Sequence, residues 1–346
     1  MDLYLLFSYF LTMAKELNEI RIIELFRKHL DSSPHIFMGL KSATGIHEDA
    51  GVIRLSDGKL LVVTTDLIGR KTHVPPKMTL FQMGQKAVTV NVSDLAAMGA
   101  EPLGLVFSVG FPKDITTKDV EDIAKGMNVA AKQYGTCVFG GDTNQTDDII
   151  LAGTAIGITN EEQILLRSGA QEDDIVAVTG WIGGAALGLY CLKKGIELDF
   201  HLLQYTLEPK ARLKEALILN KLKAVTAAGD ITDGLAWEIF KIGEASEKGI
   251  IIYEDHLPIQ EKVIEIAHAY NLDPLELALY IGEDFELVLT ISPDKWELVK
   301  KKCAEMNIKI TAIGKVISDR KILMEMKSGQ IISLRKEGYD QFKTKF

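Results

Sequence analysis

Aspartate residues recur in this sequence where apolar segments end. Asp66 follows the apolar residues 60–65, and Asp142 follows residues 137–139 through a Gly-Gly pair. The other members of the set are Asp49, Asp94, Asp230 and Asp233. Carboxylates that converge on one point repel one another unless cations lie between them, and oxygen ligands of this kind select Mg²⁺ or Ca²⁺ over zinc. The set therefore predicts a Mg²⁺ site that keeps water ligands and binds substrate phosphates.

Each aspartate also has a simpler interpretation. An Asp that precedes a helix can cap its free N–H groups, and Asp94 or Asp233 could do only that. For one aspartate taken alone, capping or turn formation explains the position as well as metal binding does. Because the pattern recurs along the chain, we favour the metal site for the set as a whole.

The glycine-rich segments match no common nucleotide-binding loop. Gly180, Gly183 and Gly184 follow an expected strand and open an expected helix, but their spacing departs from G-x-G-x-x-G. We predict instead that these glycines allow close packing of helix and strand. The sequence holds no G-x-x-x-x-G-K-[ST] segment either, which excludes a Walker loop and favours a metal-dependent phosphate site.

Composition and charge narrow the class of protein. The chain has 346 residues, 47% hydrophobic and 25% charged, which is ordinary for a globular protein with room for two domains. Its 39 Lys and Arg residues stand against 48 Asp and Glu residues, and the formal net charge of −9 opposes nucleic-acid binding through the protein's own cations. The three cysteines, Cys137, Cys191 and Cys303, fit neither a disulfide framework nor a zinc site, so we expect a reducing, cytoplasmic location.

Apolar periodicity predicts two α/β halves. Strands are expected where β-branched or apolar runs end at Gly, Asp or Pro, and helices where apolar residues recur at helical spacing. The first half should contain strands over 60–65, 103–109, 136–139 and 149–158 and helices over 79–98 and 117–134, the second capped by Thr116 or Thr117. The second half should contain strands over 175–179, 250–253, 285–291, 308–313 and 322–326, and helices from 183 and over 210–220, 234–246 and 262–269.

The polar stretch 159–174 separates these halves, so domains of residues 14–160 and 161–346 are expected. We interpret residues 1–13 as an N-terminal extension, because Met13 begins a more usual opening. The apolar run 3–11 lacks a basic leader and a cleavage site, and it is too short to span about 30 Å of hydrocarbon. Neither a signal peptide nor a membrane anchor is therefore expected.

Taken together, the motifs resemble the thiamine-monophosphate kinase family, from about residue 16 to residue 342. That family shares a superfamily with aminoimidazole ribonucleotide synthetase, selenophosphate synthetase and the hydrogenase maturation dehydratase. The motifs are Gly-Ile-His-Glu-Asp-Ala at 45–50, Thr-Thr-Asp at 64–66 with His73, Asn-Val-Ser-Asp-Leu-Ala-Ala-Met-Gly-Ala at 91–100, Gly-Gly-Asp-Thr at 140–143, Arg-Ser-Gly-Ala at 167–170, Asp-Ile-Thr-Asp-Gly-Leu at 230–235, Gly-Glu-Asp-Phe-Glu-Leu at 282–287 and Gly-Tyr-Asp at 338–340. Several are common to the superfamily, whereas the segments at 167–170, 282–287 and 338–340 in combination indicate the kinase.

The resemblance implies an α/β (α+β) fold of two domains, of the aminoimidazole ribonucleotide synthetase-like type. The N-terminal domain would bind ATP and Mg²⁺ and form a homodimer, and the C-terminal domain would close over the substrate. The implied activity is ATP-dependent phosphorylation of thiamine monophosphate to thiamine diphosphate by direct transfer, assisted by several Mg²⁺ ions. Because attacker and donor are both anionic phosphates, positioning and charge neutralisation would supply most of the catalysis.

The same resemblance implies roles for individual residues. Mg²⁺ would be held by Asp49, Thr64, Thr65, Asp66, Asp94, Asp142, Asp230 and Asp233. ATP would contact Gly141, Asp142, Arg167 and Thr232, thiamine monophosphate would contact His73, Glu283 and Tyr339, and Asp142, Arg167 and Asp233 would act in catalysis.

The chain departs from the family pattern in ways that leave alternatives. Glu48 stands where an aspartate is usual, His47 where a glycine is usual, and residues 67–70 replace a Thr-Leu-Val run, which bears on acceptor specificity. The alternatives are aminoimidazole ribonucleotide synthetase or a non-catalytic ATP-binding paralogue. The other two superfamily members are disfavoured, because they need a reactive cysteine near the N-terminus or at the C-terminus, whereas here the first cysteine is Cys137 and the last residue is Phe346.

Overall fold

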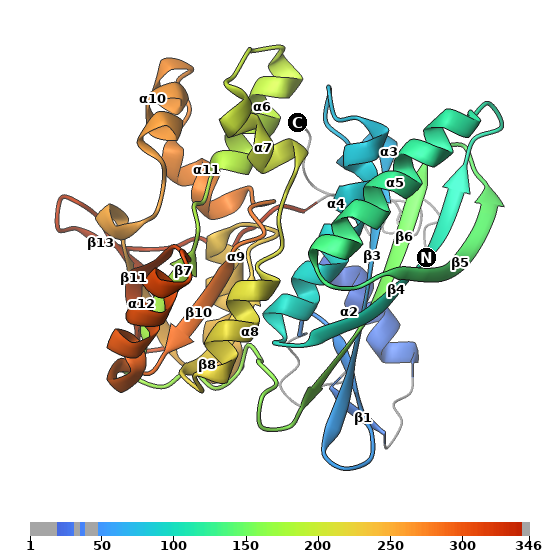
Figure 1. Cartoon of the computed structure of the whole chain (residues 1–346). Helices are drawn as coiled ribbons and strands as arrows, with labels where there is room; N and C mark the ends of the chain where they lie inside the picture. Colours follow the sequence, from blue (N-terminus) through green and yellow to red (C-terminus); the bar gives the residue numbers. More distant parts are fainter. Residues whose placement is uncertain (1–18, 31–34, 39–47, 341–346) are drawn as a thin grey trace, which may run out of the picture.

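The structure, a computed structural model, describes residues 19–30, 35–38 and 48–340. The expected extension 1–13 and His47 therefore lie outside the described residues. Figure 1 shows two α/β halves side by side, each built around one sheet, with β6 ending at Asn160 and β7 beginning at Ile175. No helix in the described part of the chain is both long and apolar enough to cross a membrane.

The first sheet has six strands in the order β1-β2-β3-β6-β4-β5. Neighbouring strands are antiparallel except β4 and β5, which run parallel. Along β3, buried residues alternate with more exposed ones, so the sheet has a core face and an open face. The strands are β1 (Ile36–Met38), β2 (Gly51–Arg54), β3 (Lys59–Gly69), β4 (Glu101–Phe111), β5 (Val138–Gln145) and β6 (Ile150–Asn160).

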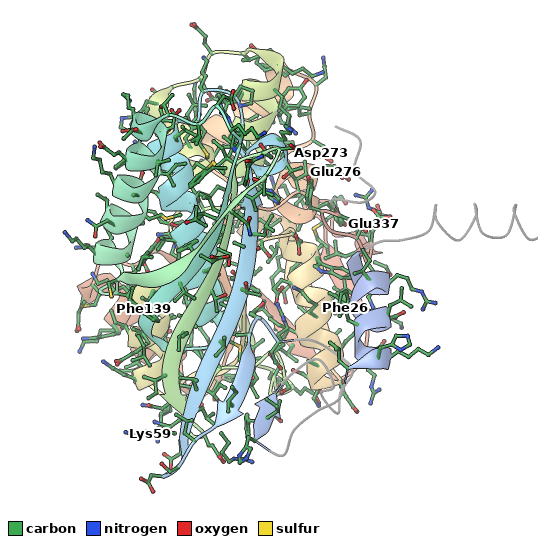
Figure 2. The ribbon with its side chains drawn as sticks, turned by 90° about the vertical axis from the view of Figure 1, so that its right-hand side faces the viewer. Phe26, Lys59, Phe139, Asp273, Glu276 and Glu337 are labelled. Atoms are coloured by element: carbon green, nitrogen blue, oxygen red, sulfur yellow. The ribbon has the colours of Figure 1, made fainter. Side chains whose placement is uncertain are left out.

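Helices α4 and α5 cover the core face of this sheet (Figure 1). Each begins at a capping box, Thr79 with Gln82 and Thr116 with Asp119, so Thr116 is the cap of the two expected candidates. Figure 2 looks onto the open face, where the strands lie in front and no described helix covers them. The described helices of this half are α2 (Glu19–His29), α3 (Arg70–His73), α4 (Leu80–Ala97) and α5 (Thr117–Gln133).

The second sheet has seven strands in the order β13-β12-β9-β11-β7-β10-β8. Its neighbouring strands are antiparallel except β9 and β12. Its strands are β7 (Ile175–Thr179), β8 (Val225–Asp230), β9 (Gly249–Tyr253), β10 (Leu287–Ile291), β11 (Ile310–Ile317), β12 (Ile322–Glu325) and β13 (Ile331–Ser333).

The glycines at 180–184 have close neighbours in the second half. A Cβ at Gly180 would lie 2.0 Å from Oε1 of Glu286, and one at Gly183 would lie 3.3 Å from Cα of Ala278, so they allow close packing, but against a side chain and a neighbouring helix and not against the expected strand. The helices are α6 (Gly184–Lys194), α7 (Phe200–Leu207), α8 (Leu213–Lys221), α9 (Leu235–Ser246), α10 (Glu261–Ala269), α11 (Pro274–Tyr280) and α12 (Trp296–Glu305), with short 3₁₀ turns at Glu254–His256 and Pro293–Lys295.

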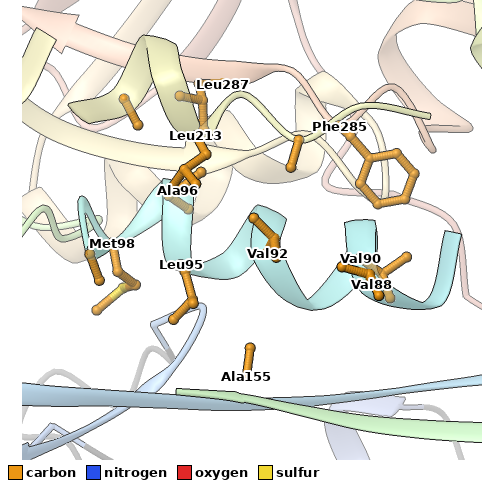
Figure 3. Packing of buried hydrophobic residues seen from close by; sticks show 14 of the residues in the cluster. Val88, Val90, Val92, Leu95, Ala96, Met98, Ala155, Leu213, Phe285 and Leu287 are labelled. Carbon is orange, nitrogen blue, oxygen red and sulfur yellow. The ribbon is translucent and has the colours of Figure 1, made fainter. Parts of the chain in front are cut away.

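Helix α4 lies between the two halves and carries much of the core. In Figure 3 its buried residues Val88 and Leu95 have Ala155 of β6 on one side and Leu213 and Leu287 of the second half on the other. These side chains belong to one continuous cluster of buried apolar residues. Burial of apolar surface therefore joins the halves, because neither half alone would keep this helix away from water.

Several expected element boundaries were wrong. The strand expected to stop at Thr65 continues as β3 to Gly69, because its pairing with β6 continues to the end. The strand expected over 136–139 is β5, which runs from 138 to 145, so Asp66 and Asp142 both lie within strands instead of after them. The strand expected from Phe285 begins at Leu287, since an irregular loop precedes it.

Candidate active site

Asp49, Asp94 and Asp230 bring their carboxylates together where the two halves meet. One oxygen from each lies within 4.8 Å of the others. Asp49 precedes β2, Asp94 lies near the end of α4, and Asp230 is the last residue of β8. The hydroxyl of Thr64 donates to Asp94, and the hydroxyl of Ser93 donates to Asp230. The first half therefore supplies two of these carboxylates and the second half supplies the third.

Burial raises the pKa of all three carboxyl groups. The pKa of Asp49 is raised to about 8 and that of Asp230 to about 6, chiefly by burial and further by nearby carboxylates. The pKa of Asp94 lies well above its ordinary value, because of burial and then the charge of Asp230. Among the described residues, Asp49 Oδ2 is a buried oxygen that lacks a hydrogen-bond partner. Mutual repulsion and an unsatisfied oxygen fit a divalent cation bound by oxygen ligands.

Arg167 is buried against this cluster and contacts both halves. Its guanidinium donates to Asp49 and, through Nε, to Glu238 Oε1 at 2.6 Å. Its backbone N–H donates to Glu48 Oε2 at 2.8 Å, and burial raises the pKa of Glu48 to about 7. Lys241 Nζ lies 2.6 Å from Glu238 Oε2. The arginine expected to contact ATP is therefore held by the protein's own carboxylates in this structure.

Asp66, His73, Lys86 and Glu283 form a second group. Lys86 Nζ lies 2.6 Å from Glu283 Oε1 and donates to the carbonyl oxygen of His73 at 3.2 Å. The Nδ1 atom of His73 accepts from the backbone N–H of Gly69 at 3.2 Å, and burial followed by the charge of Lys86 lowers the pKa of this imidazole. Asp66 stands two residues along β3 from Thr64, whose hydroxyl donates to Asp94, and the backbone N–H of Asp66 donates to Asn91 Oδ1 of α4 at 3.1 Å. The second group thus adjoins the carboxylate cluster.

The loop before β10 joins further candidate residues to the second group. Glu283 and Phe285 have φ values of +60° and +52°, a left-handed backbone that costs energy for residues with side chains. The backbone N–H of Glu283 donates to Thr232 O at 2.7 Å, and that of Tyr339 donates to Asp233 O at 3.0 Å. Burial, and then the charges of Glu283 and Asp233, raise the pKa of Tyr339. The structure thus brings together four candidates, namely Thr232, Asp233, Glu283 and Tyr339.

Gly141, Asp142 and Thr65 lie apart from these groups. The strand register aligns Asp66 with Gly141 in one row across β3, β6, β4 and β5. Three inter-strand spacings place the two backbones roughly 14 Å apart. A Cβ at Gly141 would lie 2.0 Å from the carbonyl oxygen of Phe107, so strand pairing by itself requires glycine there. Asp142 is exposed, and the hydroxyl of Thr65 donates to the backbone of β6 at 2.8 Å.

Sequence reasoning missed two charged residues of the site, Lys86 and Glu238. Both are almost completely buried, Lys86 in α4 and Glu238 in α9. A usable signal was present for Lys86, because Met83 and Val90 stand three residues before it and four after it, on the same helix face. A lone charge inside an apolar stripe indicates a buried partner.

Two family models match most of the chain. The AIR synthase related protein, N-terminal domain, matches residues 47–159, and the AIR synthase related protein, C-terminal domain, matches residues 171–327. The thiamine-monophosphate kinase of Pyrococcus horikoshii is 38% identical over 301 residues, covering 87% of this chain and 89% of that protein. This chain belongs to the thiamine-monophosphate kinase family. The thiamine-monophosphate kinase of Bacillus subtilis is 35% identical, with 86% of this chain and 93% of that protein covered.

Solved structures of the thiamine-monophosphate kinase family share this fold. AaThiL complexed with AMPPCP and TMP matches with a TM-score of 0.80 and 27% identity, over 94% of this chain and 97% of that one. Thiamine monophosphate kinase from Aquifex aeolicus matches with a TM-score of 0.77 and 28% identity, over 92% of this chain and 98% of that one. The expected α/β fold of two such domains is confirmed.

Proposed function

We propose that this protein transfers a phosphoryl group from ATP to thiamine monophosphate and so forms thiamine diphosphate. Membership of the kinase family supports this activity. The observation that carries it is that the cluster of Asp49, Asp94 and Asp230 adjoins the group that contains His73 and Glu283, because β3 and α4 contribute residues to both. A cation-binding cluster beside a site for a charged acceptor is what transfer between two anionic phosphates requires.

Asp49, Asp94 and Asp230 are proposed to hold Mg²⁺, together with Thr64, Thr65, Asp66, Asp142 and Asp233. The orphaned oxygen of Asp49 and the raised carboxyl pKa values support this for the central three. When bound, several Mg²⁺ ions would offset the negative charge of the phosphates. The protein's own part is to keep the carboxylates convergent through the hydroxyls of Thr64 and Ser93.

His73, Glu283 and Tyr339 are proposed to bind thiamine monophosphate. Because Nδ1 of His73 accepts a hydrogen bond and its pKa is lowered, a neutral ring carries its proton on Nε2 and can donate it to the acceptor phosphate. The carboxylate of Glu283 suits the thiamine cation, and Tyr339 can stack on its ring. The second pKa of a phosphate monoester is near 6, so the attacking oxygen needs no strong general base.

The proposed enzyme is a homodimer that pairs the open faces of the first sheet. Every residue of β5 is exposed, and the apolar side chains of Phe139 and Leu67 are 61% and 48% exposed. An apolar sheet face with an exposed edge strand favours association with another copy. Such pairing would give Gly141 and Asp142 a surface from which to contact ATP.

The remaining assignments follow from the same proposal. We assign ATP contact to Arg167 and Thr232, and a part in catalysis to Arg167 and Asp233. Arg167 also orients Asp49. Residues 14–160 would bind ATP and Mg²⁺ and dimerise, and residues 161–346 would close over the acceptor. The cysteines are free thiols, which suits the expected cytoplasmic location.

A direct assay tests the activity. The purified protein, incubated with ATP, Mg²⁺ and thiamine monophosphate, should release thiamine diphosphate and ADP. Oxidation converts thiamine monophosphate and thiamine diphosphate to fluorescent thiochromes, which chromatography then separates. Absence of product under conditions where ATP binds would refute the kinase. Turnover of formylglycinamidine ribonucleotide alone would instead favour the synthetase alternative, and ATP binding with neither reaction would favour the non-catalytic paralogue. An Asp142→Asn variant of undiminished activity would remove Asp142 from the site.

A further inference from the structure

We propose that Lys86 is a positioning residue for the acceptor site and that it acts through Glu283. The proposal rests on the proposed function, because that function gives Glu283 its contact with the thiamine cation. Lys86 lies early in α4, and only 1% of its surface is exposed. A buried charged residue requires polar partners, and the partners of Lys86 indicate its role.

The contacts of Lys86 satisfy its charge inside the protein. A buried ammonium strongly destabilises a fold unless acceptors meet its donors. Nζ of Lys86 lies 2.6 Å from Oε1 of Glu283 and donates to the carbonyl oxygen of His73 at 3.2 Å. Both partners are residues assigned above to thiamine monophosphate, so the ammonium lies directly behind the proposed acceptor site.

The two partners come from different halves of the molecule. His73 ends α3, the short helix that follows β3, whereas Glu283 lies in the loop before β10. The backbone N–H of Glu283 also donates to Thr232 O at 2.7 Å, beside Asp233. One ammonium therefore fixes the first-half turn against the second-half loop and sets the distance between them.

Glu283 needs such support because its own backbone does not fix its carboxylate. Its φ of +60° is a left-handed conformation that side chains disfavour, and its side chain is 31% exposed. Without Lys86 the carboxylate can turn towards water. The contact with thiamine would then be lost although Glu283 is still present, whereas the carboxylate cluster of Asp49, Asp94 and Asp230 would be unchanged.

Steady-state kinetics on a two-residue cycle test this role. We compare the unmodified enzyme with Lys86→Met, Glu283→Gln and the double variant, varying thiamine monophosphate and ATP separately. Lys86→Met should raise the KM for thiamine monophosphate by about tenfold or more and leave the KM for ATP within about twofold. The double variant should match Glu283→Gln, because no carboxylate is then left for Lys86 to hold against the thiamine cation.

Controls separate this role from a general effect on folding. Lys118→Met makes the same change at an exposed lysine of α5 and should alter neither KM. If Lys86→Met does not fold, Lys86→Gln keeps a donor for Glu283 and should show a smaller rise in the same KM. Equal rises in both KM values, or effects that multiply in the double variant, would overturn the proposal. Failure of the unmodified enzyme to make thiamine diphosphate would instead refute the proposed function.

Discussion

The guanidinium of Arg167 donates to the carboxylate of Asp49, and both side chains are almost fully buried. The same guanidinium donates to Glu238 of α9. Asp49 belongs to the first half and Glu238 to the second, so the charge on one linker residue stabilises acids from both. Burial of these groups is tolerable only because they are paired.

Removal of Arg167 should therefore destabilise the protein. Arg167→Met leaves Asp49 and Glu238 buried with less compensation, and we expect a loss of about 3–5 kcal/mol in the free energy of unfolding. Urea denaturation followed by circular dichroism measures it. A loss below about 1 kcal/mol would show that the contact contributes no more than a surface pair.

Asp94→Asn should separate stability from function. In the metal-free protein the change removes repulsion with Asp230 and Asp66, so the melting temperature should stay the same or rise. The increase in melting temperature on adding Mg²⁺ should disappear, and kcat should fall by about 100-fold or more. The exposed Asp255 offers a control, since Asp255→Asn should change none of these quantities. An undiminished response to Mg²⁺ would exclude Asp94 as a ligand.

The raised pKa values predict a link between pH and Mg²⁺. The pKa values of Asp230, Glu48 and Asp49 are raised to about 6, 7 and 8, so the metal-free fold holds protons that the unfolded chain releases. The stability contributed by these groups is complete below their ordinary pKa values and is lost as pH rises through about 6 to 8. Mg²⁺ needs the ionised carboxylates, so its binding should release protons.

Calorimetry measures this proton release. Titration of Mg²⁺ at pH 7 in two buffers of different ionisation enthalpy should give different apparent heats. The increase in melting temperature caused by Mg²⁺ should also be larger at pH 8 than at pH 6. Identical heats in both buffers would mean that the carboxylates are already ionised in the metal-free protein.

The open face of the first sheet predicts the effect of a charge placed there. Phe139→Glu puts a carboxylate on an exposed aromatic position of β5 and should convert the proposed dimer to a monomer. Light scattering coupled to size-exclusion chromatography measures the mass. Leu298→Glu, at an exposed leucine of α12, should leave the mass unchanged. A monomeric unmodified protein would refute the proposed dimer outright.

Sequence periodicity predicted the elements whose residues have the matching secondary-structure propensity. It missed elements such as β8, which form because they pair with a neighbouring strand. β7 runs from Ile175 to Thr179, as expected, because its β-branched and apolar residues favour a strand. β8 was not expected, since Ala227, Ala228 and Gly229 have low strand propensity. Its antiparallel pairing with β10 makes it a strand, and no local pattern encodes that contact.

The site residues also divide into those that the sequence pattern predicted and those that only the tertiary structure places. Recurrence of aspartates predicted that carboxylates converge, and Asp49, Asp94 and Asp230 do converge, from just before β2, the last turn of α4 and the end of β8. The placement of Asp142 some strands away required the sheet order, which the sequence pattern does not contain. Glu238 was missed because an isolated charge on a helix usually faces water, and only tertiary contact with Arg167 buries it.

Helix α4 packs against both halves and also carries Lys86 and Ser93, whose partners Glu283 and Asp230 lie in the second half. A chimera that takes its first half from one relative and its second half from another therefore inherits mismatched partners along this helix. A chimera joined between the two sheets should fold only where both members of each polar pair, and both facing apolar surfaces, are exchanged together. In recombination, the chain therefore behaves as one structural unit in spite of its two sheets.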